Sequence, residues 1–212
     1  MKQLFLTSSL QTTAGNVLKK IKIKNPKVIF ITTAAEVEKG DLWWLDADRQ
    51  PLIDAGAEVT DFSITGKKPH EVRSVLEKAD IICVAGGNTF YLLQECRKSG
   101  FDTVIAELVQ KGKIYISGSA GSIVAGRNIS LAKTVDDVSQ APELRDHRGL
   151  NLIDVVIVPH LGNDFVRKGL KKSFDDLFDG KDKIVLLRDD QYLWVRENVY
   201  TIESNAKEMN EK

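Results

Sequence analysis

The amino-acid sequence predicts an α/β fold in which helices cover both faces of one mostly parallel sheet, giving three layers. Short apolar runs alternate with segments of helical periodicity from end to end, as in chains built from strand–helix–strand units with right-handed crossovers. The run Lys27-Val28-Ile29-Phe30-Ile31 is apolar at both even and odd positions, which is typical of a strand buried on both faces. The short polar turn Arg196-Glu197-Asn198 between the last apolar runs predicts an antiparallel edge at the C-terminus.

The order of the predicted elements follows this alternation along the chain. The predicted strands lie at residues 4–6, 27–32, 58–64, 80–85, 113–116, 155–158, 184–187, 193–196 and 199–202. The predicted helices lie at residues 41–55, 69–78, 89–98, 101–111, 119–126 and 163–178. Pro51 is expected to bend or split the first helix. Residues 127–150 show little periodicity, and irregular segments of that length often carry function.

The chain length and the charge balance limit the classes of protein to consider. A chain of 212 residues is expected to form a single α/β domain over residues 1–212. Thirty basic residues balance thirty acidic ones, so composition predicts neither a nucleic-acid partner nor a membrane partner. The first apolar run ends at Thr7, too soon for a signal peptide, and no window approaches the length of a transmembrane helix.

The two cysteines, Cys83 and Cys96, show neither a metal-ligand spacing nor a disulfide framework. Cys83 lies in an apolar strand pattern and is expected to be a buried thiol. Together with the composition, this favours the cytoplasm. We expect a monomer or a homodimer, and we expect no metal and no cofactor.

Three predicted strands end in unusual residues: Gly86-Gly87-Asn88-Thr89, Ser117-Gly118-Ser119-Ala120-Gly121 and Pro159-His160. In open α/β sheets, ligands bind outside the carboxyl ends of the strands. The three motifs can converge there only if their strands are neighbours in the sheet. We expect the functional site at that edge.

Ser119 has the surroundings of a nucleophile on a strand-to-helix turn. Such a turn needs small residues two positions before and after the serine, and Ser117 and Gly121 supply them. The free N–H of Ala120, at the start of the following helix, could bind a developing oxyanion. The alternatives are a glycine-rich packing turn or a phosphate-binding loop, although no P-loop lysine follows.

A serine nucleophile needs a base within hydrogen-bond reach, and the chain has three histidines. His160 directly follows a predicted strand, which favours it as the base. His70 begins a predicted helix and His147 lies in a charged stretch, so both are expected to be solvated.

The acid that would orient the histidine has two candidate locations. Asp136 and Asp137 lie in the irregular segment, and Asp189 and Asp190 follow the strand predicted at residues 184–187. Spacing alone does not choose between them.

The glycines at 86 and 87 allow a close backbone approach, so one of their N–H groups could complete an oxyanion hole. Asn88 and Thr89 beside them are candidate substrate-binding residues. The alternative is a plain strand-to-helix turn in which Asn88 or Thr89 caps the helix.

At these motifs the sequence resembles the peptidase E family, which includes aspartyl dipeptidase and cyanophycinase. The matching stretches are Ala85-Gly86-Gly87-Asn88-Thr89-Phe90-Tyr91-Leu92-Leu93, Ser117-Gly118-Ser119-Ala120-Gly121 and Val158-Pro159-His160, with a weaker match at Leu187-Arg188-Asp189-Asp190-Gln191. The order and spacing of these stretches fit from about residue 27 to residue 202.

The resemblance implies a serine peptidase on a fold akin to class I glutamine amidotransferases. It implies Ser119 as nucleophile, His160 as base, and the N–H groups of Gly87 and Ala120 as oxyanion donors. The family's acid is typically a glutamate after the late strand. Here we favour Asp190, because its spacing to the following apolar residues fits better, with Asp189, Asp136 and Asp137 as alternative or site-shaping acids.

The leading functional hypothesis is hydrolysis of short peptides, including those with an N-terminal aspartate, through an acyl-enzyme on Ser119. One alternative is a non-catalytic ligand-binding or regulatory protein on the same scaffold. Another is an esterase or amidase that acts on small metabolites. Contact between Ser119 and His160, with a carboxylate on the second ring nitrogen, would distinguish the enzyme from the binding protein.

Overall fold

Seven strands form the central sheet of the structure, a computed structural model that describes residues 1–172 and 182–205. The strands are β1 (Gln3–Thr7), β2 (Lys27–Ile31), β3 (Glu58–Phe62), β4 (Ile81–Val84), β5 (Ile114–Gly118), β8 (Gln191–Arg196) and β9 (Val199–Ser204). Their order across the sheet is β3-β2-β4-β5-β1-β8-β9. The first five are parallel, whereas β8 and β9 are antiparallel, which confirms the predicted C-terminal edge.

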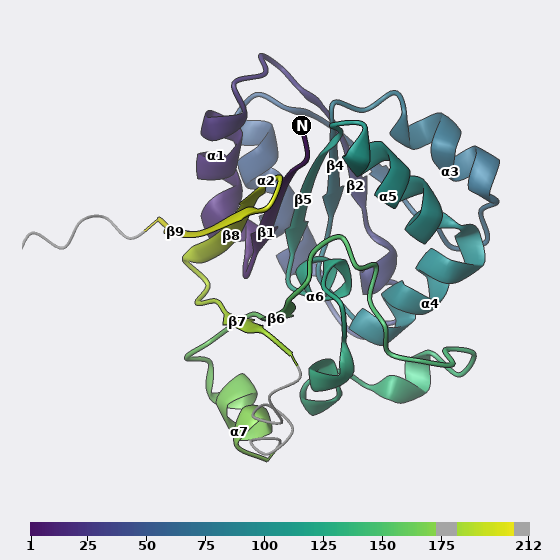
Figure 1. Cartoon of the computed structure of the whole chain (residues 1–212), viewed down its shortest axis with the longest axis vertical. Coiled ribbons are helices and arrows are strands. Elements are labelled where there is room, and N and C mark those ends of the chain that lie inside the picture. The colour runs from purple at the N-terminus through teal and green to yellow at the C-terminus, as the bar shows by residue number, and fades with distance from the viewer. Residues whose placement is uncertain (173–181, 206–212) are drawn as a thin grey trace, which may run out of the picture.

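Helices cover both faces of this sheet, as predicted. Helices α1 (Leu10–Ile21) and α2 (Trp43–Asp54) lie on one face, and α3 (Pro69–Leu76), α4 (Thr89–Ser99), α5 (Phe101–Gln110) and α6 (Ala120–Ala125) lie on the other (Figure 1). Neighbouring strand residues face opposite layers. Phe5 packs with the α1 and α2 side, and Leu4 and Leu6 pack with the other.

Helix α1 was not among the predicted elements, although its pattern is visible in the sequence. Leu10, Ala14, Val17 and Leu18 recur at helical spacing, and all four are buried. Of the two expectations for Pro51, that it bends or that it splits its helix, the split is wrong, because α2 runs through it. A proline removes one N–H donor, and on a surface helix water can satisfy the carbonyl that is left over.

A second, smaller sheet lies outside the seven-stranded one. Strands β6 (Val156–Val158) and β7 (Ile184–Leu186) pair with each other in parallel, and helix α7 (Asp164–Lys172) follows β6 (Figure 1). The strand that leads to His160 is therefore no neighbour of the strand that leads to Ser119. Of the helix predicted at residues 163–178, residues 173–178 lie outside the described part of the chain.

The segment from residue 127 to residue 150 is irregular, as predicted. It contains two short 3₁₀ helices, η2 (Ser130–Thr134) and η3 (Val138–Gln140). Another 3₁₀ turn, η1 (Thr33–Ala35), follows β2. These segments and α7 surround the carboxyl-end edge of the sheets, so they shape whatever binds there.

Strand order brings several chain segments to that edge. The parallel strands β4, β5 and β1 are neighbours, so residues 85–87, 119 and 8 emerge side by side. Strand β8 runs the other way and begins at the same edge, where Tyr192 pairs with Thr7. The residues just before β8 therefore join this group.

Cys83 is buried, as expected, and so is Cys96. Burial raises the pKa of both thiols well above the ordinary value, so neither side chain is suited to nucleophilic chemistry. Across the residues with described positions, no helix combines the length and the apolar character needed to cross a membrane.

The close packing of α6 on β4 gives a first prediction. A Cβ atom at Gly121 would lie 2.5 Å from the carbonyl oxygen of Val84, so we expect Gly121→Ala to lower the free energy of unfolding by about 2 kcal/mol or more. Gly15 in α1 has nothing within 4 Å of such an atom, so Gly15→Ala should raise stability by about 0.5–1 kcal/mol. Urea denaturation measures both changes, and equal effects would contradict this packing.

Candidate active site

Ser119 occupies a strained turn between β5 and α6. Its backbone has φ 46° and ψ −113°, a conformation that non-glycine residues rarely adopt. Its N–H donates to the carbonyl oxygen of Ser8 at 3.1 Å, which holds the turn against the end of β1. Gly86 leaves room for the side chain, since a Cβ there would lie 3.2 Å from the Ser119 Cβ. The hydroxyl is thereby presented at the carboxyl edge of the sheet.

The Ser119 hydroxyl contacts the imidazole of His160. Its Oγ lies 2.9 Å from Nε2, and Nδ1 of the same ring lies 2.6 Å from Oδ1 of Asp189. The hydrogen bond from His160 lowers the pKa of Asp189, so this carboxylate is ionised at neutral pH. A serine, a histidine and a carboxylate are therefore aligned in the order that nucleophilic catalysis requires.

The two-stranded sheet accounts for the meeting of His160 and Asp189. His160 follows β6 by two residues and Asp189 follows β7 by three, and the paired ends are tied by a hydrogen bond from the Leu161 N–H to the Leu187 carbonyl at 2.9 Å. The strands pair in parallel, so both segments leave the sheet on the same side. The base reaches Ser119 even though its strand lies outside the main sheet.

Ser8 connects the two sheets at this point. Its hydroxyl accepts a hydrogen bond from the backbone N–H of His160 at 2.7 Å and lies 2.8 Å from Oδ1 of Asp189, to which it donates. Ser8 is fully buried. Sequence reasoning missed this residue, because the place of β1 beside β5 was not predicted; a polar residue directly after a buried strand was the available signal.

The preference for Asp190 as the acid is wrong in its geometry. The Asp190 carboxylate turns away from His160 and accepts hydrogen bonds from Ser204 and from the Arg188 guanidinium. Its pKa is lowered, first by the Ser204 hydroxyl and then by Arg188. The spacing argument failed because β7 ends at Leu186 and the chain turns before β8, so the earlier aspartate faces the imidazole.

Gly87 and Ala120, the predicted oxyanion donors, are both close to Ser119: Gly87 lines the same cleft, and Ala120 directly follows the serine. Neither donates to an acceptor within residues 1–172 and 182–205. Gly87 has φ +124°, and a Cβ there would lie 2.2 Å from the Ala34 carbonyl oxygen, so a side chain is excluded. Ala120 is the first residue of α6, where the helix end favours negative charge.

The candidate substrate-binding residues Asn88 and Thr89 make structural contacts in the folded chain. Asn88 caps α4 by accepting the Tyr91 N–H at 2.9 Å, and its side-chain amide donates to the Asp137 carbonyl. Thr89 is fully buried, and its backbone N–H donates to the Asp136 carboxylate at 2.9 Å. Asn88 therefore caps α4, as one of the two interpretations of this motif predicted.

Asp136 and Asp137, the two acids of the irregular segment, have different surroundings. Asp136 lines a pocket together with Ser119 and His160. Asp137 caps η3, where its carboxylate accepts the Ser139 N–H at 2.9 Å, and it contacts none of the three aligned residues. Of the other histidines, His70 is exposed, whereas His147 is half-buried and packs its ring on Phe90, so only one of them is solvated.

Comparison with known proteins decides the family. The model of peptidase family S51 matches residues 4–202. The chain belongs to peptidase family S51. It is therefore a serine-type peptidase, as the resemblance implied.

Relatives of this S51 peptidase cover most of its length. An uncharacterized peptidase of Pasteurella multocida is 38% identical over 77% of this chain and 79% of the relative. An uncharacterized peptidase of Listeria monocytogenes is 32% identical over 92% of this chain and 95% of the relative. The crystal structure of a candidate peptidase E from Listeria monocytogenes EGD-e, 29% identical, superposes with a TM-score of 0.86 over 97% of this chain and 100% of that one. A peptidase from an acI-B1 Actinobacterium, 19% identical with a TM-score of 0.71, shares the fold over 97% and 88%.

The cleft beside the serine of this S51 peptidase carries carboxylates. It has a volume of about 340 Å³, and its lining includes Ser119, His160, Trp44, Glu38 and Asp48. Burial raises the pKa of Glu38, and the nearby Asp136 raises it further. Burial also raises the pKa of Asp48 to about 6, although the Gln11 N–H and His160 oppose this. The cleft therefore gains negative charge as the pH rises toward neutrality.

Asp48 gives a prediction on pH and stability. Its folded-state pKa, about 6, lies above the ordinary 3.8, so its contribution to stability is fully present below about pH 4 and is lost as the pH rises through 6. The loss should be on the order of 1–3 kcal/mol. We expect Asp48→Asn to remove this loss, so that the variant gains stability over the wild type between pH 4 and pH 7.

The matched control is Asp54→Asn, which changes an exposed carboxylate of the same helix. Denaturant unfolding at a series of pH values gives the free energy of unfolding for both variants. If both depend on pH in the same way, the burial of Asp48 does not have this effect.

Proposed function

We propose that this S51 peptidase hydrolyses short peptides through an acyl-enzyme on Ser119, with His160 as general base and Asp189 as the orienting acid. The observation that carries the proposal is the continuous contact from Ser119 Oγ to His160 Nε2, at 2.9 Å, and from His160 Nδ1 to Asp189, at 2.6 Å. The strained turn and the two free N–H groups beside it support the same chemistry.

In the acylation step, Ser119 Oγ forms a bond to the carbonyl carbon of the scissile amide, and its proton moves to His160 Nε2. The carbonyl electron pair moves to the oxygen, where the N–H groups of Gly87 and Ala120 stabilise the negative charge. The C–N bond then breaks, and the leaving nitrogen takes the proton from His160. The amine product departs and the acyl group remains as an ester of Ser119.

In the deacylation step, a water molecule attacks the ester carbon and gives its proton to His160. The C–O bond to Ser119 breaks, and Oγ regains the proton from Nε2, so the enzyme returns to its starting state with a carboxylic acid released. Asp189 stays ionised throughout. It stabilises the imidazolium that forms twice in each cycle, which its lowered pKa permits.

The two alternatives from the sequence have less support. A purely ligand-binding protein does not need the strained Ser119 backbone or the aligned His160, which argue for chemistry. An esterase would use the same machinery, and a comparison of dipeptides with p-nitrophenyl esters separates the two activities.

A preference for an N-terminal aspartate calls for a cation or several hydrogen-bond donors at its side-chain carboxylate. The described lining of the cleft contains Glu38 and Asp48 and no lysine or arginine, whereas Lys39 lies in a second hollow that shares Glu38 with this cleft. Kinetic comparison of Asp-Leu with Ala-Leu and Leu-Leu tests the preference, and equal rates would reject it.

The test of the proposal is Ser119→Ala. Loss of the nucleophile should lower kcat/KM for dipeptides by about 10⁴-fold or more and should abolish labelling by a fluorophosphonate probe. The exposed Ser74 in α3 supplies the matched control, Ser74→Ala, which should leave both unchanged. Dipeptidase activity within a few-fold of the wild type in Ser119→Ala would reject Ser119 as the nucleophile.

A further inference from the structure

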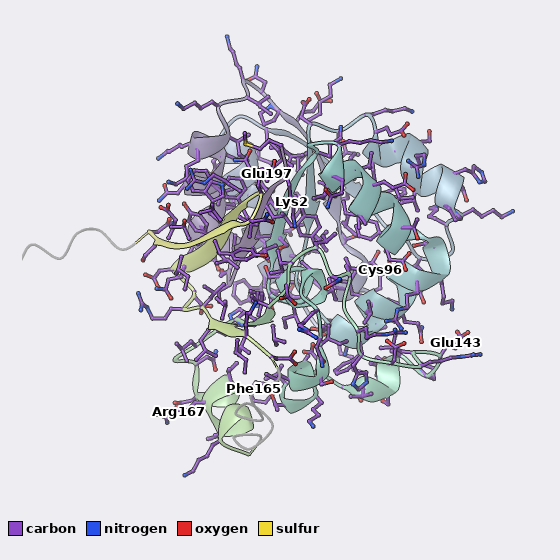
Figure 2. The ribbon with its side chains drawn as sticks, in the orientation of Figure 1. Lys2, Cys96, Glu143, Phe165, Arg167 and Glu197 are labelled. Carbon is purple, nitrogen blue, oxygen red and sulfur yellow. The ribbon has the colours of Figure 1, made fainter. Side chains whose placement is uncertain are left out.

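Strand β1 is held in place at both of its ends. At the amino end, the Lys2 N–H donates to the Glu197 carboxylate at 2.8 Å and the Glu197 N–H donates to the Lys2 carbonyl at 3.0 Å; Figure 2 shows the two residues next to each other. At the carboxyl end, the Ser8 N–H donates to the Gln191 carbonyl at 3.2 Å. Ser8 is therefore fixed relative to β8, the strand that Asp189 precedes.

The Ser8 hydroxyl closes a ring of three contacts with the base and the acid. Its Oγ accepts the His160 N–H at 2.7 Å and donates to Oδ1 of Asp189 at 2.8 Å. The same Oδ1 lies 2.6 Å from Nδ1 of the His160 ring. Because Ser8 is fully buried, water does not replace a bond that is lost here, so neither the base nor the acid turns freely.

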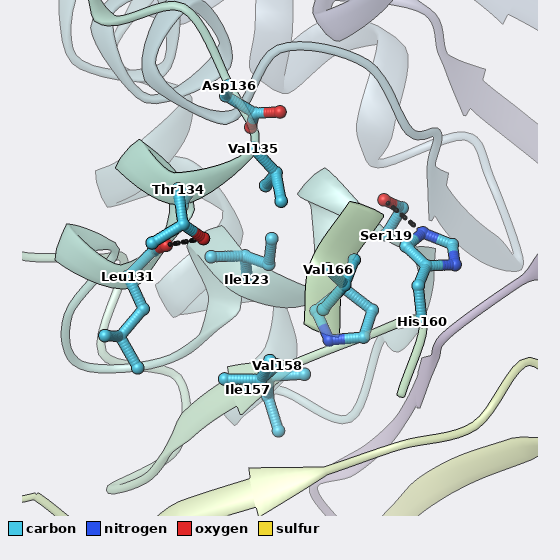
Figure 3. A pocket seen from close by; sticks show the side chains of 12 residues that line it. Ser119, Ile123, Leu131, Thr134, Val135, Asp136, Ile157, Val158, His160 and Val166 are labelled. Atoms are coloured by element: carbon cyan, nitrogen blue, oxygen red, sulfur yellow. Dashed lines mark hydrogen bonds between the residues drawn. The ribbon is translucent and has the colours of Figure 1, made fainter. Parts of the chain in front are cut away.

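His160 needs such a constraint. Its backbone has φ 59°, in the left-handed region that residues other than glycine rarely adopt. Its side chain is 30% exposed, so packing alone does not fix the ring. Figure 3 shows the imidazole reaching Ser119 through one hydrogen bond, 2.9 Å long. A small rotation of His160 would break this contact.

The backbone of the acid is held separately from its side chain. Thr12, in the first turn of α1, donates its hydroxyl proton to the Asp189 carbonyl oxygen. The Thr12 carbonyl in turn accepts the side-chain amide of Asn205, whose N–H donates to the Asp190 carbonyl at 2.8 Å. Loss of the Ser8 hydroxyl therefore leaves the acid turn anchored and removes only the contacts that orient the side chain.

We propose that Ser8 is a positioning residue of the reaction, whose hydroxyl holds the His160 backbone and the Asp189 carboxylate in one geometry so that the imidazole stays aligned with Ser119 through both proton transfers. The inference rests on the proposed function, since it assigns Ser8 to the machinery of the acyl-enzyme mechanism. Ser8 acts through the base and the acid, because its only hydroxyl proton is donated to Asp189.

A positioning role affects turnover more than binding. His160 takes and returns a proton twice in each cycle, and each transfer requires hydrogen-bond distance and direction. A base that turns freely spends less of its time in reach of Ser119, and a displacement of about 1 Å can lower the rate by about 100-fold. The Ser8 hydroxyl has no further proton with which to bind a peptide, so KM should change little.

The experiment compares three variants at Ser8. Ser8→Ala should lower kcat for dipeptides by about 10- to 100-fold and leave KM within about three-fold of the wild type. Ser8→Thr keeps the hydroxyl, whereas Ser8→Val has the same branched shape without it. Any loss from crowding is common to this pair, so kcat of Ser8→Thr should exceed that of Ser8→Val by about 10-fold or more.

The matched control is Ser99→Ala at the end of α4. The Ser99 hydroxyl is also buried, donates to the Glu95 carbonyl at 2.7 Å and accepts the Phe101 N–H at 3.3 Å, but it contacts none of the three aligned residues. Urea denaturation should show a loss of stability in both alanine variants. Only Ser8→Ala should slow turnover and the labelling of Ser119 by a fluorophosphonate, which needs the base but no peptide.

The outcomes distinguish the inference from the function on which it rests. Equal kcat in Ser8→Thr and Ser8→Val, in an enzyme that Ser119→Ala inactivates, would overturn the role of Ser8 and leave the proposed function intact. A raised KM with unchanged kcat and unchanged labelling in Ser8→Ala would also overturn it, because the residue would then act in binding. If the wild type neither hydrolyses peptides nor is labelled at Ser119, the proposed function fails and the role of Ser8 fails with it.

Discussion

The hydroxyl of Ser8 is the contact on which the arrangement of the site depends. It lies at the end of β1, in the middle of the large sheet, while His160 and Asp189 follow the strands of the small one. It accepts the His160 N–H and donates to Asp189, and the Ser8 carbonyl accepts the Ser119 N–H. One buried residue therefore contacts all three aligned residues. A buried hydroxyl with both hydrogen bonds made holds a single geometry, because leaving either partner unsatisfied is unfavourable.

The same junction explains why the site is open on one side and closed on the other. The strained Ser119 turn and the glycines after β4 leave an accessible cleft, with Trp44, Glu38 and Asp48 along it. Toward β6 and α7 the surface is apolar and the pocket is small.

The fold could be predicted from the sequence because apolar runs and turns report local structure. The layers, the parallel order and the antiparallel edge are confirmed, and the residues that meet at the site include three that the motifs singled out: Ser119, His160 and Asp189, the last as an alternative acid. The features that could not be predicted depend on pairing between segments that lie far apart in the sequence. No local pattern says that β6 pairs with β7 outside the main sheet, or that β1 lies beside β5 and brings Ser8 to the site. The choice of Asp190 failed for the same reason, since one residue of register decides which carboxylate faces the imidazole.

The central claim is that the ends of the small sheet present Asp189, and not its neighbour, to the base. The kinetic comparison of Asp189→Asn with Asp190→Asn tests it most directly, because the two variants make the same chemical change one residue apart. On the proposed mechanism, Asp189→Asn lowers kcat/KM for dipeptides by about 100-fold or more, whereas Asp190→Asn, which leaves the His160 contact intact, stays within about three-fold of the wild type. A large loss in Asp190→Asn together with near-normal activity in Asp189→Asn would contradict the account.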